Sequence, residues 1–184
     1  MARMVRIKAE PLTAEAFRPF GQIIGAPERP PDYRGGGKSE GWLVDYQAAG
    51  RTRVTVSRVP FQGFTFRKLE RHFGVTQAFI PLDGAPAVVG VAPPTDPNDR
   101  EAIPAPEQVR AFIIEGSRGY LLAHGAWHTL DRFPLYPPHT VFVILSDHET
   151  FQDLTMAYTG RGGWTLSQEV DYEARFGVTF EITL

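Results

Sequence analysis

Short runs of β-forming residues, separated by turn-forming residues, recur along the 184-residue chain and constrain its fold more than any other feature. The 18 glycines and 16 prolines favour turns between these runs. The segments that we predict as strands are 5–7, 22–24, 42–46, 52–59, 64–69, 85–92, 120–122, 139–145, 155–158, 163–166 and 178–184. Many short strands with very little helix predict an all-β sandwich or closed barrel, whose mouth is a natural site for a small molecule.

Helices and long loops are few. One or two helical turns are predicted over 11–17, because the Thr13 hydroxyl can accept an amide proton as a cap. Residues 106–112 fit a short helix with proline at its first position equally as well as a loop that enters a strand. The segments 27–41 and 93–105 are rich in proline and polar residues, and we predict surface loops there.

Two segments alternate apolar and polar residues. In 52–59, Val54 and Val56 occupy alternate positions, which predicts a strand with one buried face. The tail 172–184 also alternates, and we predict that it adds a strand to a partner subunit.

Composition excludes several classes of site and partner. The chain has no cysteine, so disulfides, thiolate metal sites and cysteine nucleophiles are excluded, and a metal would need His, Glu, Asp or amide ligands. The net charge of −2 gives no argument for a nucleic acid or an anionic membrane as partner. No run approaches the roughly 20 apolar residues of a membrane span, and no signal peptide is recognisable. We expect one domain, 1–184, in the cytoplasm.

The residues that can carry chemistry begin with Glu70-Arg71-His72. Residues two apart on a strand share a face, so Glu70 and His72 point the same way and Arg71 points oppositely. A carboxylate and an imidazole on one face can bind a divalent metal or act as an acid/base pair. Gln77 follows a glycine turn and can fold back beside them. Taken singly, these residues also fit a surface ion pair of Glu70 and a turn capped by His72.

Spacing adds to this interpretation. Two runs resemble the two cupin motifs, namely Glu70-x-His72-x4-Gln77-x6-Gly84 and Ala123-x-Gly125-x-x-His128. In the first run, Glu70 stands where cupins have a histidine, and Gln77 stands where they have a glutamate. Cupins bring such ligands together inside a double-stranded β-helix, a jelly-roll barrel. The resemblance therefore implies an all-β, cupin-like fold with a few short helices.

A closer resemblance covers most of the chain. From about Leu12 to Asp147, the order and intervals of several runs are similar to those of the ureidoglycolate lyase family. These runs are 12–17 with 20–21, 69–72 with 76–81, 109–113, Gly119 and 127–128. Members of that family are cupin-like homodimers that split ureidoglycolate into glyoxylate and urea in allantoin breakdown. Nickel or another divalent ion is linked to the activity, and no organic cofactor is implied.

The resemblance implies roles for individual residues. Glu70, His72 and His128 are the expected catalytic residues, and together with Gln77 they are the expected ligands of a divalent metal. The residues expected to contact a small carboxylate substrate are Gln77, His124 and Trp127. His124 can equally be a solvent-facing turn residue, and Trp127 can equally be part of the core.

The chain also departs from the family pattern. A Tyr-His-Arg run of the family reads Leu122-Ala123-His124 here, and its Trp-His-His-Pro reads Trp127-His128-Thr129-Leu130. The C-terminal segment from about residue 154 has no clear counterpart. Three functions therefore stay open: ureidoglycolate lyase; a related lyase, hydrolase or isomerase for another small hydroxy or amino acid; and a non-catalytic cupin that binds a small molecule.

Overall fold

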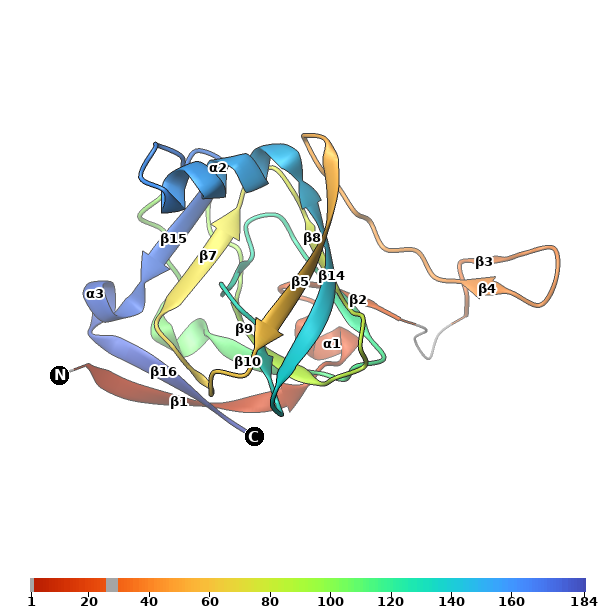
Figure 1. The fold of residues 1–184 in the computed structure, drawn as a ribbon, viewed down its shortest axis with the longest axis horizontal. Helices are drawn as coiled ribbons and strands as arrows, with labels where there is room; N and C mark the ends of the chain where they lie inside the picture. The colour runs from red at the N-terminus through yellow and green to blue at the C-terminus, as the bar shows by residue number, and fades with distance from the viewer. Residues whose placement is uncertain (1, 26–29) are drawn as a thin grey trace.

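Two curled β-sheets that face each other make up most of the computed structural model, which describes residues 2–25 and 30–184. The nine-stranded sheet contains, in spatial order, β15 (Ser167–Asp171), β7 (Lys68–His72), β12 (Trp127–Thr129), β9 (Ala87–Ala92), β10 (Arg110–Ile114), β1 (Arg3–Pro11), β16 (Val178–Thr183) and β6 (Thr65–Phe66), with β13 (Phe133–Pro134) paired to β9. The five-stranded sheet contains β2 (Gly21–Ile24), β11 (Gly119–Leu122), β8 (Gln77–Pro81), β14 (His139–Asp147) and β5 (Thr52–Pro60). Figure 1 shows that the sheets enclose one interior.

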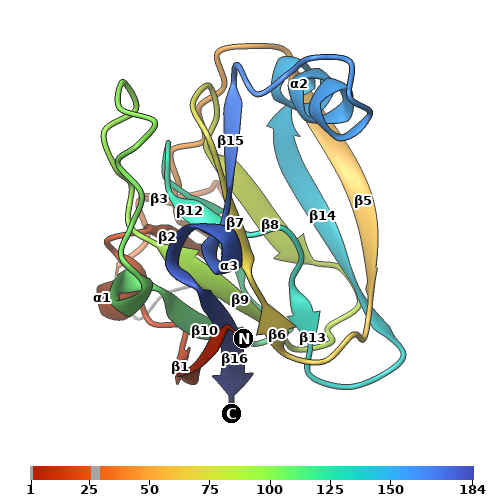
Figure 2. The ribbon, with the colours of Figure 1, turned by 90° about the vertical axis from the view of Figure 1, so that its left-hand side faces the viewer.

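Helices are short and lie at the edges of this barrel. They are α1 (Ala14–Phe17), α2 (His148–Tyr158), α3 (Tyr172–Phe176) and the 3₁₀ turn η1 (Pro106–Gln108). Figure 2 shows α2 over the upper ends of β14 and β5, with a loop leading from it to β15. None of the helices in the described ranges reaches the length and apolar character that crossing a bilayer needs. The prediction of a cupin-like, mostly β fold with few helices is confirmed.

The interior between the sheets is largely aromatic. Phe17, Phe79, Phe112, Tyr120 and Phe142 are each no more than 1% exposed. The Phe79 and Tyr120 rings stack at 5.0 Å, and Phe17 meets Phe112 edge-on at 5.3 Å. Such rings fill a large volume with few rotatable bonds, so they give the barrel a rigid floor on which polar side chains can be positioned.

Most of the predicted strands and helical turns are present. Thr13 caps α1, because its hydroxyl oxygen accepts the amide proton of Ala16 at 3.2 Å. The segment 106–112 combines both alternatives, since the 3₁₀ turn is followed directly by β10. The loop predicted over 93–105 contains no strand or helix.

Three strand predictions are wrong. Residues 42–46 form no strand, and the Leu43 amide donates instead to the Asp32 carboxylate at 2.7 Å. Residues 155–158 belong to α2, because Asp147 caps that helix by accepting the Thr150 amide proton at 2.7 Å. Residues 163–166 form a loop, and the strand begins only at β15.

The long N-terminal loop is also corrected in part. Residues 27–29 lie outside the described residues. Within 30–41, β3 (Tyr33–Arg34) and β4 (Glu40–Gly41) form a two-stranded hairpin that extends away from the barrel (Figure 1). None of the four residues in these two strands is buried, so apolar alternation in the sequence does not predict them.

Exposure alternates along β5 as predicted, but the face that carries Val54 and Val56 is the exposed one. Val54 and Val56 are both 64% exposed. They lie opposite Leu145 and Val143 of β14, whereas the inward Phe142 lies opposite Ser57. The register with β14 therefore turns the valines outward, because paired residues share a face of a sheet.

The C-terminal tail pairs within its own chain. It forms α3 and then β16, which lies between β1 and β6. The β1 pairing is parallel and runs from Arg3 with Val178 to Lys8 with Thr183. Because both edges of β16 are occupied, the prediction that the tail adds a strand to a partner is wrong.

Candidate active site and metal centre

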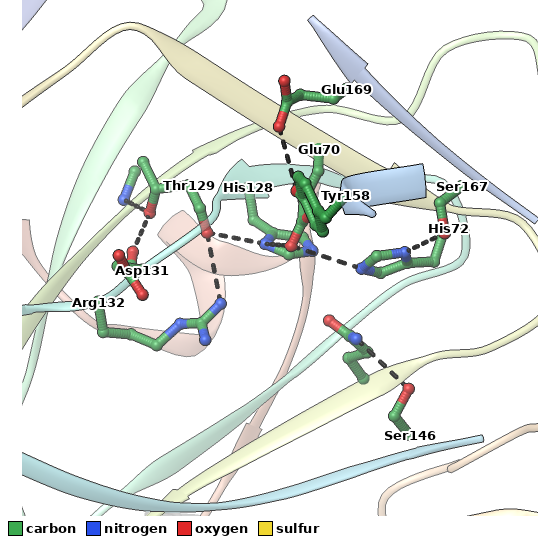
Figure 3. Close-up of polar contacts among 12 residues, drawn as sticks. Glu70, His72, His128, Thr129, Asp131, Arg132, Ser146, Tyr158, Ser167 and Glu169 are labelled. Atoms are coloured by element: carbon green, nitrogen blue, oxygen red, sulfur yellow. Dashed lines mark hydrogen bonds and ion pairs between the residues drawn. The ribbon is translucent and has the colours of Figure 1, made fainter. Parts of the chain in front are cut away.

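Three of the predicted site residues come from two neighbouring strands. Glu70 and His72 lie on β7, and His128 lies on the adjacent antiparallel strand β12, directly opposite Glu70. Paired residues share a face, so all three side chains point into the barrel (Figure 3). The intervening Arg71 and the neighbouring Trp127 point to the other face.

The three side chains are close together and buried. The Oε1 atom of Glu70 lies 3.8 Å from Nε2 of His72 and 4.0 Å from Nδ1 of His128. The residues are 7%, 3% and 1% exposed, respectively. One potential ligand atom from each lies within 4.8 Å of the other two. A carboxylate and two imidazoles at this separation suit a divalent transition metal.

The hydrogen bonds of the two imidazoles leave one nitrogen of each directed at the site. Nδ1 of His128 lies 3.0 Å from the Thr129 carbonyl oxygen, which can only accept, so Nδ1 carries the proton. Nδ1 of His72 lies 3.0 Å from the Ser167 hydroxyl. Both Nε2 atoms and Oε1 of Gln77 are buried with no hydrogen-bond partner. Buried acceptors without partners are costly, and metal-binding histidines usually have their second nitrogen fixed in this way. The residues therefore fit a divalent cation.

Burial shifts the protonation of all three groups toward the neutral form. It raises the pKa of Glu70 to about 7, against the opposing effect of the nearby Arg132 charge. Burial and the Arg132 charge lower the pKa of His72 to about 4, and burial and His72 lower the pKa of His128 well below its usual value. Neutral imidazoles can bind a cation or accept a proton.

A narrow cavity, too small to hold a water molecule, adjoins the two imidazoles. Its lining residues are His72, Val75, Gln77, Leu122, Ala123, Ala126 and His128. A larger hollow of about 180 Å³, lined by Lys68 and Asp131 among others, contains none of the three clustered residues.

Comparison with known proteins decides the family. A family model described as ureidoglycolate lyase matches residues 4–166. The chain belongs to the ureidoglycolate lyase family. It is 33% identical over 150 residues to a ureidoglycolate lyase of Azotobacter vinelandii, covering 78% of this chain and 81% of that protein. It is 36% identical over 132 residues to one of Chelativorans sp., covering 68% and 76%.

Among solved structures, the chain is similar to RmlC from Streptococcus suis in complex with dTDP-D-xylose, with a TM-score of 0.32 and 11% identity over 52% of this chain and 43% of that one.

The other predicted contact residues of this family member lie at different depths. Gln77 lines the cavity, and its amide donates to the Ser146 hydroxyl at 3.4 Å. His124 is exposed on the turn that follows β11 and does not line the cavity. Trp127 is fully buried in a second core cluster, and its indole N–H donates to the Thr95 hydroxyl at 3.1 Å.

Three residues that contact the cluster were missed in the sequence. They are Ser167, which bonds His72; Tyr158, which bonds Glu70; and Arg132, which shares the Thr129 carbonyl with His128. Tyr158 lies in the segment 155–158 that we predicted as a strand, and Ser167 lies just beyond the predicted strand 163–166. Only the pairing of β15 with β7 and the course of α2 bring them to the site, so no local pattern signals them.

Tyr158 is expected to hold Glu70 in position. Its hydroxyl lies 3.1 Å from Oε2 of Glu70 and 3.1 Å from Oε2 of Glu169, which leaves Oε1 of Glu70 toward the imidazoles. Losing such an outer contact typically weakens metal affinity by about 10–100-fold. We expect Tyr158→Phe to weaken divalent-cation binding about 10-fold in titration calorimetry, with little change in Tm. Tyr136→Phe, at an exposed tyrosine, is the matched control, and equal affinity in both variants would refute this role.

Proposed function

We propose that this protein is a ureidoglycolate lyase, a carbon–nitrogen lyase that releases urea and glyoxylate in allantoin and purine breakdown. The proposal rests on one observation: in a chain of this family, Glu70, His72 and His128 lie close together in the interior and could hold a cation. The related proteins of Azotobacter vinelandii and Chelativorans sp. bear the name ureidoglycolate lyase.

The reaction requires movement of one proton and breakage of one bond. The substrate carries a hydroxyl and a ureido nitrogen on the same carbon. When a base removes the hydroxyl proton, the oxygen forms a carbonyl and the C–N bonding pair leaves with the nitrogen. The nitrogen then takes up a proton, so urea and glyoxylate form and no water is consumed.

The buried side chains suit these proton transfers. Without a bound metal, the imidazole of His72 or His128 can act as the base, because its lowered pKa keeps it neutral at neutral pH. Glu70, with a pKa of about 7, can exchange a proton with the leaving nitrogen. Gln77 offers an unpaired amide oxygen that can orient the substrate.

A divalent cation is proposed to bind to Glu70, His72, Gln77 and His128, with nickel as the first candidate. When bound, it supplies positive charge that acidifies the substrate hydroxyl and stabilises the developing oxyanion. The unpaired Nε2 atoms and the unpaired amide oxygen support this ligand set.

Product release tests the function. We expect the purified protein to form glyoxylate and urea in equal amounts from racemic ureidoglycolate. Prolonged chelation should lower the rate at least about 100-fold, because the stabilising charge is lost, and Ni²⁺, Mn²⁺ or Zn²⁺ should restore it. Absence of both products with every cation would refute the lyase proposal.

A second candidate is a related lyase, hydrolase or isomerase for another small hydroxy or amino acid. The replacement of the family's Tyr-His-Arg by Leu122-Ala123-His124 supports it. Turnover of another acid in a substrate panel, with no turnover of ureidoglycolate, would favour this candidate. Binding of a carboxylate without any turnover would favour a non-catalytic cupin.

A homodimer is also proposed, formed through the outer face of the β5–β14 pair. This face presents Val54 and Val56 beside Leu145 and Val143 at an edge of the five-stranded sheet, and exposed apolar edges favour association. We expect a dimer in sedimentation velocity and a shift to monomer for Val56→Glu, with Met4→Glu on β1 as control. A monomeric wild type at micromolar concentration would refute the dimer.

The chain is further proposed to be one domain that works in the cytoplasm. The pairing of β1 with β16 supports a single domain, because it joins the two ends of the sequence. The lack of cysteine is compatible with a reducing compartment. Cell fractionation of the tagged protein checks the compartment.

A further inference from the structure

Arg132 is a buried arginine near the Glu70 carboxylate, whose pKa its charge lowers. It is 5% exposed, and within residues 2–25 and 30–184 its guanidinium forms no ion pair with a carboxylate. Its Nη2 donates a hydrogen bond to the Thr129 carbonyl at 3.3 Å, and its Nε has no hydrogen-bond partner. A buried guanidinium without a direct ion pair is costly, so this environment favours binding of an anion.

The guanidinium lies beside the metal and proton-transfer cluster. The Thr129 carbonyl accepts from both Nη2 of Arg132 and Nδ1 of His128 (Figure 3). The Arg132 guanidinium also lies over the Phe79 ring, 3.9 Å from its centroid, and Phe79 meets the His128 ring edge-on at 6.1 Å. One face of the guanidinium is therefore covered by Phe79, whereas its Nε edge remains available.

A second polar group lies on the same aromatic floor. Tyr120 is fully buried and stacks on Phe79 at 5.0 Å, and its hydroxyl interacts with the Arg132 side chain. A guanidinium and a hydroxyl that lie together beside one ring form a donor pair of the kind that recognises a carboxylate.

We propose that Arg132 and the Tyr120 hydroxyl form the binding site for the substrate carboxylate. This inference rests on the proposed function, since it places the carboxylate of a small α-hydroxy acid against Arg132 and its hydroxyl toward the imidazoles. The fork of Nε and Nη2 matches the two carboxylate oxygens, a match that lysine cannot reproduce. His124, the expected substitute for the family's arginine, is exposed on its turn and therefore does not face the interior.

A purely structural role for Arg132 makes a different prediction. If the guanidinium only packs on Phe79, its replacement lowers Tm and leaves substrate affinity unchanged in the folded fraction. If it binds the carboxylate, its replacement raises KM and leaves binding of a neutral analogue unchanged. The two roles are therefore separable by comparing a carboxylate with its amide.

The experiment measures ureidoglycolate kinetics and calorimetric binding of glycolate and glycolamide for wild type, Arg132→Gln, Arg132→Lys and Tyr120→Phe. We expect about a 100-fold rise in KM and in the glycolate Kd for Arg132→Gln, and a smaller rise for the other two. The kcat and the glycolamide Kd should change less than about 5-fold. Tyr136→Phe, at an exposed position, is the control for the tyrosine change.

The outcomes separate this inference from the lyase proposal. If Arg132→Gln does not fold, Arg132→Lys and Tyr120→Phe carry the same test. Unchanged KM and glycolate Kd in the folded variants, with wild-type turnover intact, overturn the carboxylate site alone. Glycolate binding that depends on Arg132, in a protein that does not turn over ureidoglycolate, supports the site and overturns the lyase proposal.

Discussion

Replacing His128 with alanine is expected to lower the release of glyoxylate and urea at least about 1,000-fold, because the change removes a base or cation ligand from the cluster. His128 is 1% exposed, lies opposite Glu70 in the strand register, and has an Nε2 atom with no partner. No other imidazole occupies that position on β12. Initial rates with ureidoglycolate and calorimetric titration with Ni²⁺ measure the two losses.

The stability of this variant should change little compared with its activity. The Nε2 atom is already unpaired, so truncating the ring removes an unsatisfied polar group together with some packing. His139→Ala, at the start of β14, is the matched control and should keep rate and affinity within about twofold of wild type. A folded His128→Ala protein with wild-type rate would remove the cluster from the mechanism.

The sequence predicted the centre of this site because its residues are related by strand periodicity. Glu70 and His72 are two apart, and the structure places both on the inner face of β7 with Arg71 opposite. His128 was predicted from motif spacing, and the β12–β7 register brings it to Glu70. Local alternation and motif intervals thus predict which side chains share a surface.

The surroundings of the cluster could not be predicted in this way. Tyr158 reaches Glu70 from the end of α2, whose last four residues we predicted as a strand, and Asp147 caps the start of that helix. Arg132 stands out only once its burial is known, since an arginine after a strand is usually exposed. Similarly, the outward valines of β5 depend on its register with β14, which alternation alone does not fix.

The outer face of β7 is expected to control stability, and Arg71→Met is expected to lower the free energy of unfolding by about 3 kcal/mol. Arg71 is fully buried and donates to the Gln168 side chain, to Thr95 and to the carbonyls of Asp96 and Asp99. Its guanidinium also lies 4.7 Å from the Trp127 ring centroid. Methionine keeps much of the volume but leaves these acceptors without their donor, so the 93–105 loop should detach from β7 and β15.

Thermal and urea denaturation measure this loss, which corresponds to a fall in Tm of roughly 6–12 °C for a chain of this size. Arg6→Met is the matched control, because the Arg6 side chain is 76% exposed in its ion pair with Glu181 and such pairs contribute less than about 1 kcal/mol.

Since Arg71 points away from Glu70 and His72, the folded fraction of Arg71→Met should bind Ni²⁺ with wild-type affinity. A Tm equal to that of wild type would mean that the loop contacts of Arg71 contribute nothing to the fold. Loss of Ni²⁺ affinity at unchanged Tm would contradict the separation of the two faces of β7.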